Sequence, residues 1–332
     1  MKLEKWQSRA LRLAGSAALL AGIFWFIPFS DVVKTLRSVH LGYALVGVLL
    51  MLTTGYLDAL ALWLPLNRVG VPGGHWPVFE IKMISRFYGQ FLPSELMASA
   101  YKLHRLANPT KQWGEVAAGM AFSRIVSMLV LVLLGLTLWA IEMPSGSGRW
   151  AGYLLVAMAI GLIGLHVTAR SARISLFVEQ LFRKRALAWL HGRLLDKALA
   201  FGRKTGDCYR LFGNAIYPVM LFALARHVLG IFSFAALALA LDIHLSLLAI
   251  GWIRVVLAAL LMLPISVAGF GVREGSLLVL LQDYAVAPGD AVALAFLLFI
   301  AGLLCNGIGG LFEIRNLLAP RRAREELAPG TD

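Results

Sequence analysis

The segment LPISVAGFGVREG, residues 263–275, has the composition of a membrane binding site. It places a proline, three glycines and the neighbouring Arg273 and Glu274 between two strongly apolar stretches. In a bilayer, backbone polar groups must be satisfied internally, so such a break survives only where it packs in protein or lines a watery cavity. Charges at that depth are costly and usually functional. We therefore predict that this segment forms half of a binding or translocation site.

A second interrupted segment, 76–106, carries Arg86, Gln90, Glu95 and Lys102 between apolar stretches. Arginine offers a planar fork of donors, and a helix N-terminus offers unpaired backbone N–H groups, so cations near helix ends suit a phosphate. Lys102 could equally extend to the membrane surface. Arg86 and Glu95 are harder to explain in that way, and the segment is predicted to supply the other half of the site.

Further charges lie inside or beside the apolar stretches. Arg124 falls within 113–141, where a lone charge normally faces the bundle interior, and Asp58 is a weaker candidate in an earlier stretch. Glu274 is predicted either to receive a proton or to pair with Arg254 or Arg124, because burial favours the neutral form of a carboxyl group. A purely structural pair of Arg273 and Glu274 is the alternative.

The composition is that of a membrane protein. The 332 residues are 59% hydrophobic and 15% charged, whereas soluble domains are about 45–50% apolar and 25% charged. Since each spanning helix needs about 20 residues, membrane segments and their connections use nearly the whole chain. We predict an all-α polytopic membrane protein that forms a single membrane domain over residues 1–332.

The apolar stretches predict both the spans and a repeat. Two interrupted stretches, 76–106 and 246–282, are predicted to be re-entrant helical hairpins that enter from opposite sides. They occupy corresponding places in two possible halves, 42–141 and 213–318, and both breaks contain Leu-Pro followed closely by Ser. This arrangement predicts an inverted repeat of the kind that builds alternating-access transporters. Six full spans are expected, at 11–29, 42–66, 113–141, 151–169, 213–241 and 290–318.

The net charge of +13 comes largely from loops between apolar stretches, so it sets orientation and does not indicate nucleic-acid binding. The positive-inside rule places both termini and the basic stretch 170–210 in the cytoplasm. Apolar residues at helical spacing predict that this stretch is an interfacial helix able to attract anionic lipids. Zincin, C-x-x-C, P-loop and G-x-S-x-G motifs are missing, so no metal, cofactor or enzymatic activity is predicted.

Two runs of sequence resemble a known family. Residues 263–299, LPISVAGFGVREGSLLVLLQDYAVAPGDAVALAFLLF, are similar to the C-terminal signature of the lysylphosphatidylglycerol synthase transmembrane, or flippase-like, family. The N-terminal signature resembles RFYGQFLPSELMASAYKLHRL followed by FSRIVSMLVLVLLG. The resemblance covers roughly 10–318 and implies a lipid-translocating membrane domain without the soluble aminoacyltransferase domain that some members append.

The chain also departs from the family pattern. Members often read P-S-x-x-G-G-D-x-x-R, but here Ser99 replaces the acid and Lys102 the arginine, and Ser123 precedes Arg124 where Asp is common. Glu95 and Glu274 therefore remain as the candidates for proton coupling. The residues that match the family motifs are Pro93, Ser94, Arg124, Pro264, Ser266, Gly269, Gly271, Arg273, Glu274 and Gly275.

Together these observations predict a flippase that moves an anionic, phosphate-bearing lipid or lipid-linked sugar across the bacterial inner membrane. Anionic phospholipids and polyprenyl-phosphate-linked molecules are the expected ligands, beside the surrounding membrane lipids. The alternative is a non-transporting membrane partner that presents a lipid to a glycosyltransferase or aminoacyltransferase, with 170–210 as its docking surface. The predicted substrate site comprises Arg86, Gln90, Pro93, Ser94, Glu95, Lys102, Arg124, Arg254, Pro264, Ser266, Gly269, Gly271, Arg273 and Glu274.

Overall fold

The computed structural model describes residues 29–71, 73–91, 95–171, 206–261 and 269–318, and their regular secondary structure is entirely helical. Five helices are long and apolar enough to cross a membrane, and they lie within three residues of five predicted spans. The remaining prediction, 11–29, lies outside the described residues except for its last residue. The chain is therefore a multi-pass helical membrane protein. The five helices are α3 (Leu41–Arg68), α6 (Trp113–Glu142), α7 (Arg149–Arg170), α10 (Ile216–Leu239, after the 3-10 turn Gly213–Ala215) and α13 (Pro288–Leu318).

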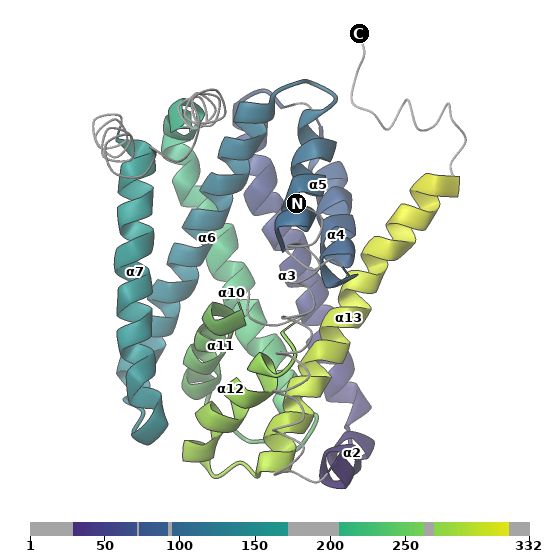
Figure 1. The fold of residues 1–332 in the computed structure, drawn as a ribbon, viewed down its shortest axis with the longest axis vertical. Coiled ribbons are helices and arrows are strands. Elements are labelled where there is room, and N and C mark those ends of the chain that lie inside the picture. Colours follow the sequence, from purple (N-terminus) through teal and green to yellow (C-terminus); the bar gives the residue numbers. More distant parts are fainter. Residues whose placement is uncertain (1–28, 72, 92–94, 172–205, 262–268, 319–332) are drawn as a thin grey trace, which may run out of the picture.

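Between the long helices lie two pairs of shorter ones. The first pair is α4 (His75–Phe91) with α5 (Glu95–Ala107), and the second is α11 (Leu247–Leu261) with α12 (Val272–Leu281). None of the four reaches the roughly 20 residues needed to cross a bilayer, and the helices of each pair pack against each other. Figure 1 shows the first pair at the upper end of the bundle and the second at the lower end.

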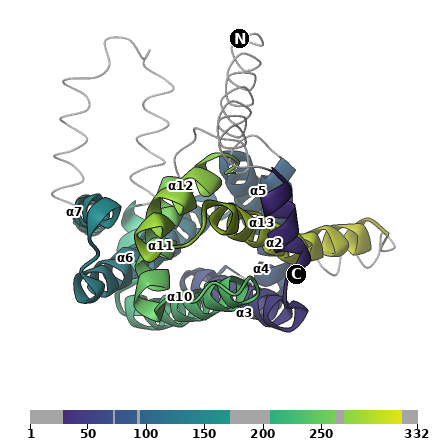
Figure 2. The same ribbon diagram turned by 90° about the horizontal axis from the view of Figure 1, so that it is seen from below.

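The packing of the long helices links the two pairs. The helices α3 and α10 lie side by side through the bundle (Figure 2). The helix that follows each short pair packs on the first helix of the other pair, because α6 contacts α11 and α13 contacts α4. A repeat of 42–141 and 213–318 predicts this exchange of partners. The inverted repeat itself stays a prediction.

Glycines allow both exchanged contacts to be close. A Cβ atom on Gly135 of α6 would lie 2.6 Å from the Cβ of Val255 on α11. A Cβ atom on Gly309 of α13 would collide with the backbone carbonyl of Met83 on α4. Small residues let membrane helices approach until their backbones touch. These two glycines therefore position the short helices against the long ones.

Polar contacts reinforce the packing of α13 on α4. Nη2 of Arg315 lies 2.6 Å from Oε2 of Glu80, a residue only 8% exposed. The hydroxyl of Tyr88 donates to Oε1 of Glu313 at 3.1 Å. The ion pair and the hydrogen bond both join α13 to α4, so polar interactions stabilise this contact in addition to the close packing.

The apolar surface of the bundle is divided between core and exterior. Among the described residues, Trp252 of α11 is the largest fully buried side chain, and it belongs to an apolar cluster that also includes residues of α6, α10, α12 and α13. On α7, by contrast, Tyr153 and Ile160 are 80% and 67% exposed. An exposed apolar face is the expected surface of a helix that meets lipid chains. The remaining elements are α2 (Phe29–Arg37), η1 (Gly146–Gly148) and η3 (Gln282–Tyr284).

Replacing Gly309 with alanine should destabilise the bundle, because the added methyl group has no room against the Met83 carbonyl. Overpacking typically costs about 1–3 kcal/mol, measurable as a lower Tm in detergent. Gly307→Ala, on the same helix, is the matched control because a Cβ there meets nothing within 4 Å. Equal Tm values for the two variants would contradict the packing described for α13 and α4.

Candidate functional site

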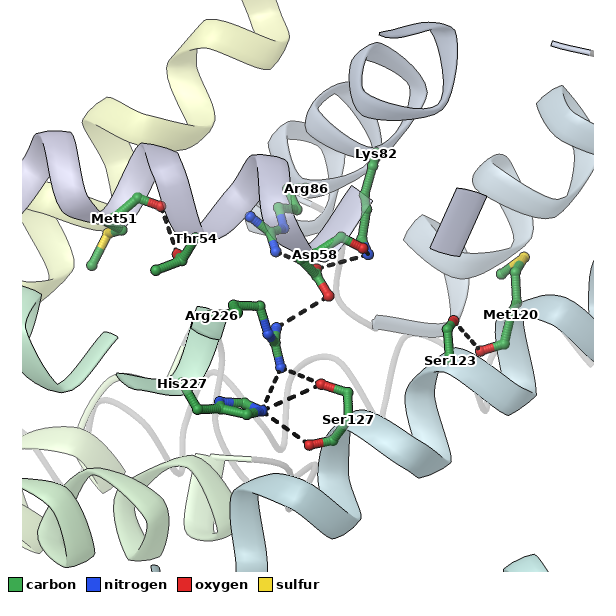
Figure 3. Close-up of polar contacts among 10 residues, drawn as sticks. All are labelled: Met51, Thr54, Asp58, Lys82, Arg86, Met120, Ser123, Ser127, Arg226 and His227. Carbon is green, nitrogen blue, oxygen red and sulfur yellow. Dashed lines mark hydrogen bonds and ion pairs between the residues drawn. The ribbon is translucent and has the colours of Figure 1, made fainter. Parts of the chain in front are cut away.

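A buried carboxylate, Asp58 of α3, lies at the centre of a cluster of cations. Lys82 Nζ and Arg86 Nη2 lie 2.8 and 2.6 Å from its Oδ2, and Arg226 Nη1 lies 3.2 Å from its Oδ1 (Figure 3). The Asp58 side chain is only 15% exposed. We call Asp58, Lys82, Arg86 and Arg226 the ion cluster. Its three cations exceed its one carboxylate by two formal charges.

The spacing on α4 explains two of these contacts. Lys82 and Arg86 are four residues apart, so they project from the same face of the helix. That face meets α3, where Lys82 Nζ also donates to the backbone carbonyl of Asp58 at 2.7 Å. A Cβ atom on Gly55 of α3 would lie 3.1 Å from Nη1 of Arg86, so this glycine leaves room for the guanidinium.

Arg226 extends the ion cluster from α10 to α6. Its Nη2 donates to Oγ of Ser127 at 2.6 Å and lies 2.9 Å from Nε2 of His227. His227 is 1% exposed, and the same Nε2 lies 2.9 Å from the carbonyl oxygen of Ser127. These two histidine contacts are alternatives, because Nε2 accepts from Arg226 in one tautomer and donates to Ser127 in the other.

Three further cations lie within electrostatic reach of the ion cluster. Lys102 of α5 interacts with Lys82, while Arg124 of α6 and Arg254 of α11 interact with Arg226. Five helices thus direct positive charge toward one region around Asp58. An accumulation of guanidinium and ammonium groups with so little opposing charge is suited to binding an anion.

A cavity of about 70 Å³ adjoins the ion cluster. Thr54 in its wall is one helical turn from Asp58 on α3, and Gly230 is one turn from Arg226 on α10. Among the described residues, Nη1 of Arg254 is buried without a hydrogen-bond partner. The cavity is lined by Met51, Thr54, Gly230, Ser233, Phe234, Arg254 and Leu298.

The structure brings four predicted site residues into this region, namely Arg86, Lys102, Arg124 and Arg254. The side chain of Arg124 is exposed, although it lies within electrostatic reach of the part-buried Arg226. Ser123 and Ser127 take the buried face of α6 instead.

Arg273 and Glu274 lie elsewhere, at the start of α12. Glu274 is fully buried, and its Oε2 accepts the backbone N–H of Gly271 at 2.6 Å, which caps the helix. Its Oε1 has no hydrogen-bond partner among the described residues. The Cζ of Arg273 lies 5.3 Å from the ring centre of Phe299 on α13. The predicted pairing of Glu274 with Arg254 is not among the ion pairs of the described residues.

The other predicted site residues fall in or near the two breaks. Gln90 lies on α4, and its buried Oε1 has no hydrogen-bond partner among the described residues. Gly269 and Gly271 precede α12 with φ values of +80° and +81°, a backbone region that glycine enters without strain. Pro93, Ser94, Pro264 and Ser266 lie outside the described residues, as does the side chain of Glu95.

Sequence reasoning ranked Asp58 too low and did not select Lys82, Arg226 or His227. A signal was present for the last two, since an Arg-His pair inside the span 213–241 is an intramembrane charge and such charges are usually functional. For Lys82 the available signal was its spacing of four residues from Arg86, which places both cations on one helix face. Its importance depends on the contact between α3 and α4.

The chain matches the family model described as the lysylphosphatidylglycerol synthase TM region over residues 10–310. That match spans most of the sequence. It includes α3, α6, α7 and α10 completely and the larger part of α13. Neither the curated proteins nor the solved structures include a match.

Replacing Asp58 with asparagine should destabilise the protein, because three partly buried cations lose their counter-charge. Breaking a buried ion pair on one side costs on the order of 3 kcal/mol. The double variant Asp58→Asn/Lys82→Met should recover part of that loss in thermal unfolding. Asp242→Asn is the control, since that carboxylate is 72% exposed and surface changes are usually within about 0.5 kcal/mol. A Tm equal to wild type for Asp58→Asn would contradict the central role of this carboxylate.

Proposed function

This chain belongs to the lysylphosphatidylglycerol synthase transmembrane family, and from that premise we propose that it is a flippase for an anionic, phosphate-bearing lipid. The observation that carries the proposal is the ion cluster, in which Lys82, Arg86 and Arg226 surround Asp58 inside a bundle of membrane helices. A phosphate headgroup needs such a cluster to leave water, because an unpaired charge is very costly at membrane depth.

The charge balance supports binding and release of the headgroup. Without a ligand, Asp58 is the counter-ion of the three cations that touch it. A phosphate offers more acceptor oxygens than one carboxylate and suits bidentate contacts with Arg86 and Arg226. The headgroup therefore competes with Asp58 for the same donors. In the empty site Asp58 offsets part of the positive charge. In the occupied site its competition for the donors weakens headgroup binding and so favours release.

The two pairs of short helices support an alternating-access route. They occupy opposite ends of the bundle (Figure 1). Helix α4 of one pair supplies Lys82 and Arg86 to the ion cluster, and α11 of the other places Arg254 within electrostatic reach of Arg226. Interrupted helices in two halves are typical of transporters that open alternately to each side. In this proposal the pairs are re-entrant, both termini are cytoplasmic, and the lipid tails remain in the bilayer of the bacterial inner membrane.

The charged site defines the headgroup more closely than the tail. Anionic phospholipids and polyprenyl-phosphate-linked sugars both present the phosphate that the cluster requires. The exposed apolar face of α7, including Tyr153 and Ile160, is open to either kind of tail. A partner enzyme that makes or modifies the lipid is compatible with both substrates.

Arg86→Gln should slow translocation of fluorescent phosphatidylglycerol in proteoliposomes, because it removes one cation from the ion cluster. Charge-assisted hydrogen bonds contribute about 1.5–3 kcal/mol, so we expect a rate about 10- to 100-fold lower. Arg68→Gln is the matched control, as this exposed arginine ends α3 away from Asp58.

An unchanged rate with folded Arg86→Gln protein would contradict the site, and an equal loss in Arg68→Gln would indicate a general surface-charge effect. Specific lipid binding by the wild-type protein without any translocation would contradict transport. It would favour a protein that presents its lipid to a separate enzyme.

Proton coupling through Glu274 is a separate part of the proposal. Its buried carboxylate caps α12 with one oxygen, while Oε1 has no hydrogen-bond partner among the described residues. Uptake of a proton there would remove a buried charge from the end of a short helix. The energy of the helix pair would then depend on the proton gradient.

Glu274→Gln should abolish the dependence of translocation on a pH gradient, because glutamine still accepts the Gly271 N–H but does not ionise. The transport rate with and without a gradient measures this effect. Asp242→Asn should keep the wild-type response. If Glu274→Gln also keeps it, Glu274 serves only as a cap of α12.

A further inference from the structure

The side chain of Arg254, on α11, lies against the central helix α10 at Gly230. A Cβ atom on Gly230 would overlap the guanidinium of Arg254 as it is placed, so the glycine lets the guanidinium lie directly against α10. Arg86 lies against Gly55 of α3 in a corresponding way. Each arginine belongs to the first helix of a short pair, and each reaches the bundle centre across a glycine of a central helix. The chain thus makes space for two guanidinium groups.

The two guanidinium groups differ in what they contact. Arg86 donates to the Asp58 carboxylate at 2.6 Å. Arg254 has Arg226 as a cationic neighbour, and its buried Nη1 has no hydrogen-bond partner among the described residues. A buried donor without an acceptor is costly unless a ligand or water supplies one.

The cavity beside Arg254 is large enough for a small anionic group, and its lining is mainly apolar apart from Arg254. Its volume of about 70 Å³ is several times the roughly 10–15 Å³ that one water needs. Arg254 is the charged residue of its lining. The hydroxyls of Thr54 and Ser233 already donate to the backbone carbonyls of Met51 and Gly47, each at 2.7 Å. Arg254 is therefore the donor that the cavity offers to a ligand.

The cavity lies about one helical turn from the ion cluster along α3 and α10. Thr54 precedes Asp58 by four residues on α3, and Gly230 follows Arg226 by four residues on α10. Since these two helices run in opposite directions, both steps lead the same way along the bundle. One helical turn is about 5.4 Å. Two anionic groups that are linked directly could occupy the cluster and the cavity together.

We propose that the Arg254 cavity is a second anion subsite and that the transported headgroup is a diphosphate, as in a lipid joined to its headgroup through two phosphates. This inference rests on the proposed function and narrows its substrate class. The first phosphate takes the donors of Lys82, Arg86 and Arg226, and the second takes the unsatisfied donor of Arg254. No covalent step is involved.

Calorimetric titration of the full chain in detergent with inorganic orthophosphate and inorganic pyrophosphate tests the subsite. Pyrophosphate should bind the wild-type protein at least about tenfold more tightly, the effect of one charge-assisted hydrogen bond. Arg254→Gln should weaken pyrophosphate binding at least about tenfold more than orthophosphate binding, so that this preference is lost. Arg68→Gln should leave both Kd values unchanged.

Several results would overturn the inference while leaving the proposed function intact. These are equal affinities of the wild-type protein for the two anions, a pyrophosphate preference that survives in folded Arg254→Gln protein, and an equal weakening of both anions by that variant. The wild-type comparison needs no variant to fold, and Arg254→Lys supplies a second variant that keeps the charge and should keep part of the preference. If neither orthophosphate nor pyrophosphate binds, the anion site and the proposed function are both contradicted.

Discussion

Much of this structure depends on one constraint, namely that the charge of Asp58 and the charges of its three cationic neighbours must be removed from water together. Each of these side chains alone would be expensive inside a membrane bundle. Lys82 and Arg86 reach Asp58 from α4, and Arg226 reaches it from α10. The carboxylate therefore joins α3 to two other helices, and Arg226 continues the connection to Ser127 of α6.

The short helices make this arrangement possible. A helix that ends inside the bundle can deliver a charged side chain to its centre without carrying that charge through the hydrocarbon region. The short helices α4 and α11 place Arg86 and Arg254 against Gly55 and Gly230 of the central helices. Glycines on α6 and α13 allow the first helix of each short pair to pack closely on the long helix that follows the other pair. Glycines therefore allow both the close packing of the helices and the placement of the two arginines.

Excess positive charge gives the site its chemical character. A cluster with equal numbers of cations and carboxylates would be a structural ion-pair network, whereas here three cations share Asp58 and further cations surround them. Such an excess of positive charge is suited to binding an anion. Glu274 has a different position, because it caps α12 and is separated from this competition for donors. Anion binding and any response to protons would therefore act on different helices.

The sequence by itself determined the class of protein, five of the spans to within three residues, and the places where the two short helix pairs interrupt them. These features depend on local composition, because a run of apolar residues or a Pro-Gly break has the same meaning wherever the chain folds. It also selected Arg86 and Arg254. Three features depend on the tertiary structure: Asp58 joins Lys82 to Arg226, Arg124 is exposed, and Glu274 caps a helix. Those outcomes depend on which faces of α3, α4, α6 and α10 meet, and a rotation of about 100° per residue separates neighbouring side chains that hydropathy alone treats as equivalent.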